Sequence, residues 1–238
     1  MADNIITKTP VVLCPPDGAA HLVSEKRRLV LLIRHGQTDW NTVMRLQGRE
    51  AVPLNDRGAL QAKECGETLF EAMKYGLEID KVCTSPLGRA KDTAKYITGE
   101  IRKDRAEIFD ELTERDYGAL SGTTPDERRA LRAKGFVPAE SVPDAAKRMR
   151  RALNAICRAE EDGDAVVAVT HGGVINALFS VITGGAIGTG KNFSENCGIS
   201  LVAYGTDATI PLAYGLTREM FLDYAAKYSR RLAELTKE

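Results

Sequence analysis

Two of the three histidines in this chain lie where catalytic groups are often found in α/β proteins. His35 and His171 each follow a run of apolar, strand-forming residues, and each is followed directly by a glycine. A neutral imidazole can attack an electrophile through one ring nitrogen while a backbone carbonyl fixes its other N–H. A phosphoryl group is an electrophile that such a nucleophile commonly serves. The two histidines therefore indicate phosphoryl-transfer chemistry.

Arginines and glycines near the histidines fit the same chemistry. Arg34 precedes His35, and Arg89 lies early in the helix expected after the second strand. A guanidinium group binds phosphate oxygens through two parallel hydrogen bonds and stays protonated at neutral pH. Gly36 and the pair Gly172-Gly173 remove side-chain bulk at points where backbone amides can approach an anion. We expect these residues to surround a bound phosphoryl group.

Alternating strands and helices place both histidines at one edge of a sheet. Apolar runs predict strands over 28–33, 80–84, 106–109, 165–170, 199–204 and 210–214. Helical spacing and capping residues predict helices over 55–76, 85–100, 141–161 and 172–182 and from Arg218 onward, with Ser85 as an N-cap. This order predicts an α/β fold, a three-layer sandwich with a mainly parallel central sheet flanked by helices. Ligands of such sheets bind beyond the carboxyl ends of the strands.

Composition limits the classes of partner. The 238 residues include 33 Lys+Arg and 33 Asp+Glu, so the formal net charge is zero and a nucleic-acid or membrane-surface role is disfavoured. The apolar runs are far shorter than the roughly 20 residues of a membrane helix. The first residues, with Asp3 among them, lack the positive charge of a signal peptide. We expect a cytoplasmic protein that binds a small substrate, and no pattern predicts an oligomeric state.

Cysteine usage and segment composition complete the expected organisation. Five scattered cysteines, without a C-x-x-C pair or an adjacent histidine, predict neither a zinc site nor a disulfide framework. Residues 1–25 are expected to form a loosely held N-terminal arm. Residues 26–238 are expected to form a single domain, with a small helical cap around 123–160 whose basic residues suit either a solvated surface or the steering of anions.

Several motifs carry a resemblance to a known family. Arg34-His35-Gly36-Gln37-Thr38-x-x-Asn41 resembles the R-H-G-x-T-x-x-N signature of the histidine phosphatase superfamily, which includes cofactor-dependent phosphoglycerate mutases. Further motifs follow in the family's order, namely Gln47-Gly48-Arg49, Pro53-Leu54-Asn55, Ser85-Pro86-Leu87-Gly88-Arg89-Ala90, the segment 111–122 and Thr170-His171-Gly172-Gly173. Together they cover most of residues 29–205. Ala51 stands where many relatives carry Asp, which affects that loop but no catalytic position.

The resemblance implies a phosphoglycerate mutase-like fold and a role for each catalytic residue. It makes His35 the nucleophile that forms a phosphohistidine, with Arg34, Arg89 and His171 holding the phosphoryl oxygens. Glu114 matches the family's proton donor and acceptor, which protonates the leaving alkoxide and then deprotonates the attacking water. The arginines and the histidine supply the charge compensation, so the resemblance implies neither a metal ion nor another cofactor.

The resemblance also implies which residues bind the substrate. They are Gly36, Gln37, Thr38, Asn41, Gln47, Gly48, Tyr117 and Gly172. Of these, Tyr117 equally fits a role in core packing.

Three functions remain open within the family. The sequence Glu114-Arg115-x-Tyr117-Gly118-Ala119-Leu120 resembles the wording of the mutases. The stretch from Gly122 to His171, however, is much shorter than the insertion that encloses phosphoglycerate in mutases. This favours metal-independent hydrolysis of a phosphomonoester, a small anionic metabolite, over a cofactor-dependent phosphoglycerate mutase. A catalytically inactive, phosphate-binding regulatory protein is a further alternative, disfavoured by the intact set of catalytic residues.

Overall fold

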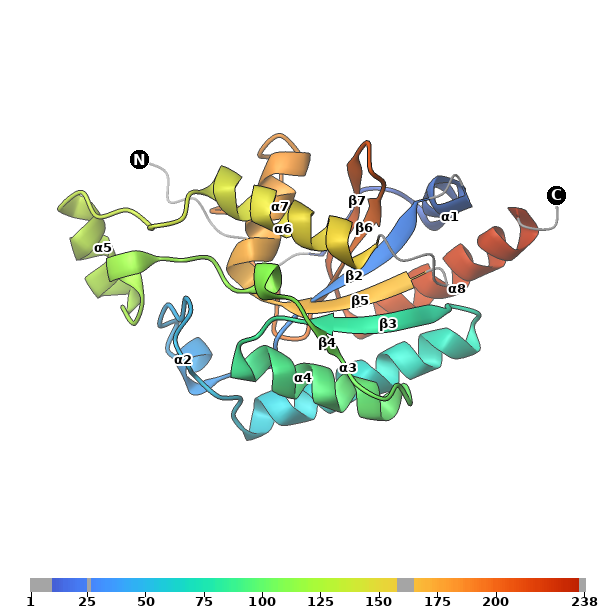
Figure 1. Ribbon diagram of the computed structural model, residues 1–238, viewed down its shortest axis with the longest axis horizontal. Helices are drawn as coiled ribbons and strands as arrows, with labels where there is room; N and C mark the ends of the chain where they lie inside the picture. The colour runs from blue at the N-terminus through green and yellow to red at the C-terminus, as the bar shows by residue number, and fades with distance from the viewer. Residues whose placement is uncertain (1–9, 25–26, 158–164, 236–238) are drawn as a thin grey trace.

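A mixed β-sheet forms the centre of the molecule. The computed structural model describes residues 10–24, 27–157 and 165–235, and these contain a seven-stranded sheet of order β1-β7-β6-β2-β5-β3-β4 (Figure 1). The strands are β1 (Val11–Val12), β2 (Arg28–Arg34), β3 (Ile79–Thr84), β4 (Glu107–Ile108), β5 (Ala165–Thr170), β6 (Ile199–Tyr204) and β7 (Thr209–Leu216). The predicted parallel pairing is confirmed for β2, β5, β3 and β4. The other half is antiparallel: β6 pairs with β2 and β7, and β1 pairs with β7. The short connection between β6 and β7 fits an antiparallel hairpin.

Helices cover both faces of the sheet, which confirms the three-layer sandwich (Figure 1). Alternate residues of β2 face opposite sides, so that Leu31 packs in one core and Leu32 in the other. The first core is covered by α1 (Pro16–Ser24), α3 (Asp56–Lys74), α4 (Gly88–Glu100) and α8 (Arg218–Leu235). The second core is covered by α6 (Val142–Ile156) and α7 (Gly172–Ile182).

The described part of the N-terminal segment differs from the expected loose arm. Ala19 and Ala20 of α1 are fully buried, and α1 packs along α8. The hydroxyl of Tyr224 in α8 donates to the carbonyl of Cys14 over 3.0 Å. The short, small-residue helix gives little signal in the sequence because its burial depends on this tertiary contact. Residues 1–9 and 25 lie outside the described residues.

The start of α4 also differs from the sequence prediction. The helix begins at Gly88 after Leu87, which makes no side-chain cap, so Ser85 is not its N-cap. The Ser85 hydroxyl instead accepts a hydrogen bond from the Leu87 amide over 3.2 Å. Asn55 and Ser141, the first residues of the helices predicted over 55–76 and 141–161, do cap α3 and α6. Helix α6 ends at Ile156, and residues 158–161 of its predicted length lie outside the described residues.

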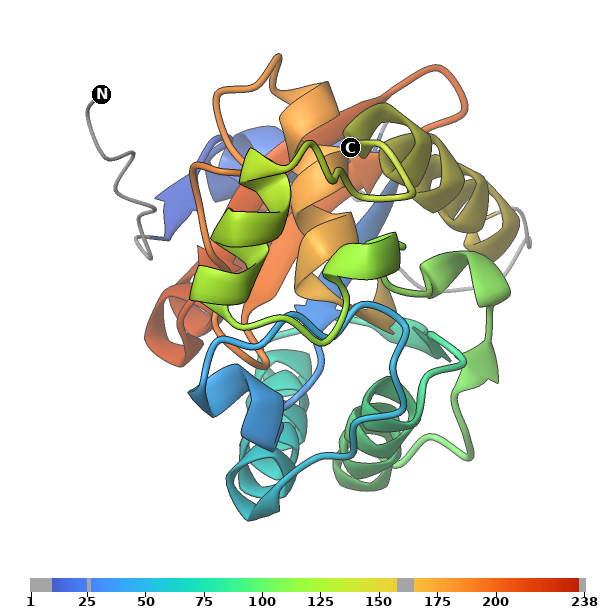
Figure 2. The same cartoon turned by 90° about the vertical axis from the view of Figure 1, so that its left-hand side faces the viewer.

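The expected cap region divides into two structurally different parts. Helix α5 (Pro125–Ala133) starts with a capping box at Thr124 and Glu127, and each of its residues is at least partly exposed. Figures 1 and 2 show α5 projecting from the end of the sandwich, on the same side as α2 (Asp39–Thr42). Helix α6 instead buries Met149 and Leu153 in the second core. Only α5 and its flanking loops therefore extend beyond the sandwich.

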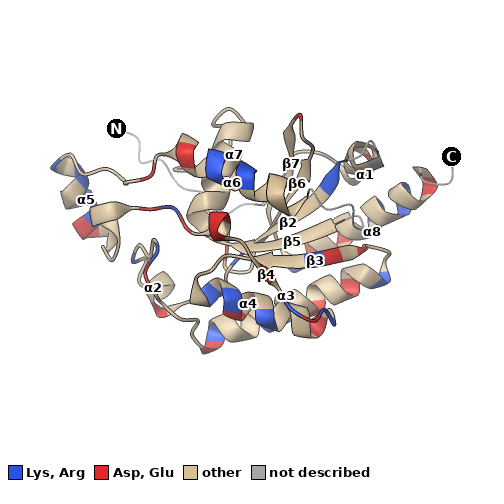
Figure 3. Cartoon of the chain, in the orientation of Figure 1, with Lys and Arg blue, Asp and Glu red and all other residues tan. Residues whose placement is uncertain are grey.

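Charged residues of both signs alternate over the outer faces of α3, α4 and α8 (Figure 3). This distribution fits the zero net charge of the chain. In the described ranges, no helix combines the length and apolar character needed to cross a membrane.

Candidate active site

Neighbouring parallel strands bring the two predicted histidines together. Arg34 at the end of β2 is in register with Thr170 at the end of β5. His35 and His171 therefore leave the sheet side by side, and their ring centroids are 5.2 Å apart. Both side chains are buried.

The hydrogen bonds of His35 assign different roles to its two ring nitrogens. Nε of Arg89 donates to Nε2 of His35 over 3.2 Å, and Nδ1 of His35 lies 2.7 Å from the carbonyl oxygen of Gly36. Because a guanidinium can only donate, Nε2 carries the lone pair and Nδ1 carries the proton. Burial lowers the pKa of His35 well below its ordinary value, and the charges of Arg89 and Arg34 lower it further. His35 is thus a neutral imidazole whose Nε2 carries the lone pair that a nucleophile needs.

Two buried guanidinium groups flank this imidazole. Arg89 donates to the carbonyls of Glu50 over 2.8 Å and Gly48 over 2.7 Å, and burial lowers its pKa to about 10. Arg34 donates to the carbonyl of Ser194 over 2.7 Å, while its Nε is buried without a partner among the described residues. Neither guanidinium forms an ion pair with a described carboxylate. Two such cations favour an anionic ligand.

Ser85 determines the orientation of the second histidine. Its hydroxyl lies 2.7 Å from Nε2 of His171 and already accepts from the Leu87 amide. The hydroxyl can therefore donate its hydrogen to Nε2, and in that arrangement the proton of His171 lies on Nδ1. Burial lowers the pKa of His171 well below its ordinary value, followed in effect by the charge of Arg89. Nδ1 is buried without a described partner, as is Nε of Arg34, and a bound phosphoryl group would satisfy both donors.

Three backbone amides hold the predicted acid–base residue. The carboxylate of Glu114 accepts from Arg115 over 2.8 Å, from Gly173 over 3.1 Å and from Val174 over 3.0 Å. The last two amides belong to the first turn of α7. A Cβ at residue 173 would stand 2.6 Å from Oε1 of Glu114 and 2.1 Å from the Tyr117 hydroxyl. Only glycine lets the helix approach both side chains this closely.

A cavity of about 270 Å³ lies beside these groups. Its walls include eight of the predicted site residues, namely Arg34, His35, Asn41, Gln47, Gly48, Glu114, Tyr117 and Gly172. Burial raises the pKa of Tyr117, so that its hydroxyl stays protonated as a hydrogen-bond donor. The cavity therefore places the candidate nucleophile, one phosphate-binding arginine and the candidate acid in one space.

Several predicted residues lie behind the cavity wall. Arg89 and His171 do not line the cavity but contact His35, Arg89 through a hydrogen bond and His171 through its ring. The side chain of Gln37 accepts from Asn55, and Thr38 caps α2, so both are engaged away from the cavity.

Gly36 also has a packing role. A Cβ at this residue would stand 2.4 Å from the carbonyl oxygen of Gly58, so glycine permits the close approach of α3.

Other residues of the cavity were not predicted as site residues. They are Met44, Arg45, Leu46, Arg128, Asn176, Phe193 and Ser194. Arg128 belongs to the basic stretch over 123–160, whose charge was compatible with the steering of anions but did not single out this residue. Phe193 lies in an irregular loop, and only the fold brings its ring to within 4.6 Å of the Arg34 guanidinium carbon. Asn196 in the same loop donates to the carbonyl of His35 over 2.9 Å and to Asn41 over 3.1 Å.

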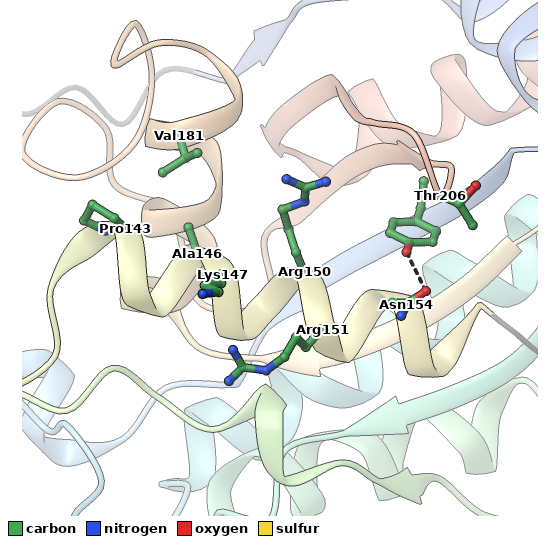
Figure 4. A pocket seen from close by; sticks show the side chains of 9 residues that line it. Pro143, Ala146, Lys147, Arg150, Arg151, Asn154, Val181 and Thr206 are labelled. Carbon is green, nitrogen blue, oxygen red and sulfur yellow. Dashed lines mark hydrogen bonds between the residues drawn. The ribbon is translucent and has the colours of Figure 1, made fainter.

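A second hollow, of about 360 Å³, lies between α6, the end of α7 and the β6–β7 hairpin (Figure 4). Lys147, Arg150 and Arg151 line it, and the Tyr204 hydroxyl donates to Asn154 beside it over 3.0 Å. It contains none of the predicted site residues. In the described residues, His, Cys, Asp and Glu form no cluster of three or more that could hold a metal ion.

Comparison with protein families gives one match over most of the chain. The model of the histidine phosphatase superfamily (branch 1) matches residues 30–216.

Both proteins named phosphatases and proteins named phosphoglycerate mutases are similar to this chain. The uncharacterized phosphatase PhoE of Bacillus subtilis is 36% identical over 157 residues, which are 66% of this chain and 78% of the relative. A 2,3-bisphosphoglycerate-dependent phosphoglycerate mutase of Beijerinckia indica is 32% identical over 190 residues, 74% of this chain and 90% of the relative. A mycobacterial glucosyl-3-phosphoglycerate phosphatase, solved with VO3, superposes with a TM-score of 0.63 at 26% identity, over 76% of this chain and 93% of that chain.

Proposed function

Because the chain belongs to branch 1 of the histidine phosphatase superfamily, we propose that it hydrolyses phosphomonoesters through a phosphohistidine formed on His35. One observation carries this proposal. The lone pair of His35 Nε2 is fixed by the Nδ1 contact to Gly36, in a buried site with two arginines that form no ion pair with a described carboxylate. This arrangement supplies both a nucleophile and compensation for phosphoryl charge.

In the first step, Nε2 of His35 attacks phosphorus and the bond from phosphorus to the ester oxygen breaks. Arg34 and Arg89 stabilise the negative charge on the phosphoryl oxygens, and Nδ1–H of His171 donates to one of them. The leaving oxygen takes a proton from the protonated form of Glu114, so that an alcohol departs rather than an alkoxide.

In the second step, a water molecule attacks the phosphohistidine. The carboxylate of Glu114 accepts a proton from this water, and the phosphorus–nitrogen bond breaks. Inorganic phosphate leaves, His35 regains its lone pair, and Glu114 is again protonated for the next ester.

Water is the acceptor that the short cap favours. Between Gly122 and His171, the 15-residue α6 packs on the sheet, and the nine-residue α5 is the helix left to cover the cavity. A mutase must exclude water while its phosphohistidine waits for the second sugar acid. Relatives named phosphoglycerate mutases nevertheless make mutase activity the second candidate.

Two assays test the proposal together. Quenching the enzyme with a labelled phosphomonoester in alkaline denaturant should trap a protein-bound phosphate that acid releases and that His35→Ala lacks. Full labelling of His35→Ala contradicts the assignment of the nucleophile. Interconversion of 2- and 3-phosphoglycerate faster than phosphate release would favour the mutase instead. An absence of turnover with a broad panel of phosphorylated metabolites would favour an inactive phosphate-binding protein.

A further inference from the structure

Arg148 of α6 contacts the backbone of the segment that ends in Glu114. Its Nη1 donates to the carbonyls of Glu111 over 2.6 Å and Thr113 over 2.8 Å, and its Nη2 lies 3.4 Å from the carbonyl of Glu114. A helix of the sandwich thus holds three of four consecutive residues of an irregular segment. The carbonyl of Glu114 is thus contacted from α6 and also accepts from Nε of Arg49 over 3.2 Å, while its carboxylate accepts from two amides of α7.

Glu140 fixes the direction of the Arg148 guanidinium. Nε and Nη2 of Arg148 each lie 2.8 Å from one carboxylate oxygen of Glu140, which forms a two-pronged ion pair. The two side chains are only 11% and 14% exposed, so solvent screens the pair weakly. Burial raises the pKa of Glu140, but hydrogen bonds from Arg148 and the Asp116 amide outweigh this effect and lower it overall.

Glu140 also holds the chain just after Glu114. Its carboxylate accepts from the Asp116 amide over 3.1 Å, and its own amide donates to the Asp116 carbonyl over 2.9 Å. Its carbonyl accepts from Nε of Arg115 over 2.7 Å. The pair Arg148–Glu140 therefore contacts the chain on both sides of residue 114.

We propose that Arg148 and Glu140 are positioning residues for Glu114, the acid–base group of the proposed reaction. This inference rests on the proposed function and extends it to residues that touch neither the substrate nor the reacting atoms. An acid displaced by about 1 Å loses on the order of a hundredfold in rate, so the backbone support determines whether Glu114 can protonate the leaving oxygen.

The geometry requires arginine at position 148. Its five N–H groups meet two carboxylate oxygens and three carbonyls. Lysine keeps the charge but has three donors on one nitrogen, so it cannot reach both groups of acceptors. Arg148→Lys therefore keeps the ion pair near Glu140 and loosens the segment that carries Glu114.

Two esters with different leaving groups can show whether a variant misplaces the acid or destabilises the whole protein. A misplaced acid slows only the ester whose leaving group needs a proton. Release of p-nitrophenolate from p-nitrophenyl phosphate needs little protonation, whereas release of glycerol from glycerol phosphate needs a proton from Glu114. The parameter kcat/KM reports the steps up to departure of the alcohol. Hydrolysis of the phosphohistidine follows those steps and is common to both esters, so it does not affect kcat/KM.

The experiment compares Arg148→Lys with wild type and with Arg151→Lys, a substitution on the exposed face of the same helix. Arg148→Lys is expected to lower kcat/KM for glycerol phosphate about 100-fold and that for p-nitrophenyl phosphate less than about fivefold, while Arg151→Lys changes neither. An equal loss with both esters, or no loss with either, overturns the inference.

Glu140→Gln provides an independent second variant that keeps the size of the side chain. It should show the same preference for the activated ester with a smaller loss, and an equal loss on both esters again contradicts the proposal, even if Arg148→Lys fails to fold. Failure of the proposed function has a separate signature, because wild-type protein would then release no His35-dependent phosphate from either ester.

Discussion

The hydroxyl of Ser85 lies 2.7 Å from Nε2 of His171, although the residues are 86 positions apart. The contact joins the loop after β3 to the end of β5, two parallel neighbours in the sheet. With the Ser85 hydroxyl as the donor, Nδ1 of His171 carries the proton, and Nδ1 has no hydrogen-bond partner among the described residues. A residue outside the predicted site thus determines which atom of His171 can donate to a phosphoryl oxygen.

Ser85→Ala should lower kcat/KM about tenfold, since the lost hydrogen bond is worth roughly 1–2 kcal/mol and frees the other tautomer. Nitrogen-15 NMR of the imidazole rings measures the tautomer directly. In wild type, Nε2 of His171 should resonate as the unprotonated nitrogen, and in the variant the two nitrogens should become more alike. An unchanged spectrum with unchanged activity would remove Ser85 from the site.

Arg89→Lys should reduce kcat/KM about 100-fold, because a point charge cannot hold a phosphoryl oxygen and two carbonyls at once. Arg105→Lys, at an exposed position, serves as the matched control. Thermal unfolding of both variants shows whether the loss follows from instability. Activity near the wild-type level in a folded Arg89→Lys protein would mean that Arg89 is structural.

Removal of divalent ions should leave phosphatase activity within about twofold, since the proposed charge compensation comes from arginines and histidine. The assay follows phosphate release after exhaustive treatment with EDTA, with and without added Mg²⁺. Loss of activity that Mg²⁺ restores would contradict this mechanism.

The stability of the protein should fall as the pH decreases below about 6.5. The folded state holds His35 and His171 with lowered pKa values, so the unfolded chain binds more protons at acidic pH. Each histidine then contributes a slope of up to about 1.4 kcal/mol per pH unit to the unfolding free energy. Urea unfolding at pH 7 and pH 5 measures the slope. His171→Asn should reduce this slope, because one of the two buried histidines is then absent.

Local sequence signals predicted how several side chains of the candidate site come together. Arg34 ends a buried strand, and His35 and His171 directly follow buried strands, so strand prediction alone gives their edge of the sheet. The prediction of Ser85 as an N-cap was wrong because the sequence Ser-Pro occurs both at the start of helices and in loops. Nothing in the local sequence shows that this loop faces a histidine. Arg148 gave no signal for its contacts, which lie 34 to 37 positions away and depend on how α6 packs. The burial of α1 was missed for a similar reason, because α8 at the other end of the chain provides the contact.

At β2 the pairing changes from parallel on the β5 side to antiparallel on the β6 side. As a result, the candidate reacting groups and part of the cavity wall lie on different segments of the chain. Because β6 runs against β2, the loop that enters β6 reaches the same edge at which β2 and β5 end, and there Cys197 and Asn196 contact the backbone of Arg34 and His35. The same loop contributes Phe193 and Ser194 to the cavity wall. Insertions or substitutions between Ile182 and Phe193 can therefore reshape the wall while the parallel strands keep the reacting groups in place, which makes this loop a natural site for evolutionary divergence and for engineering new substrate preferences.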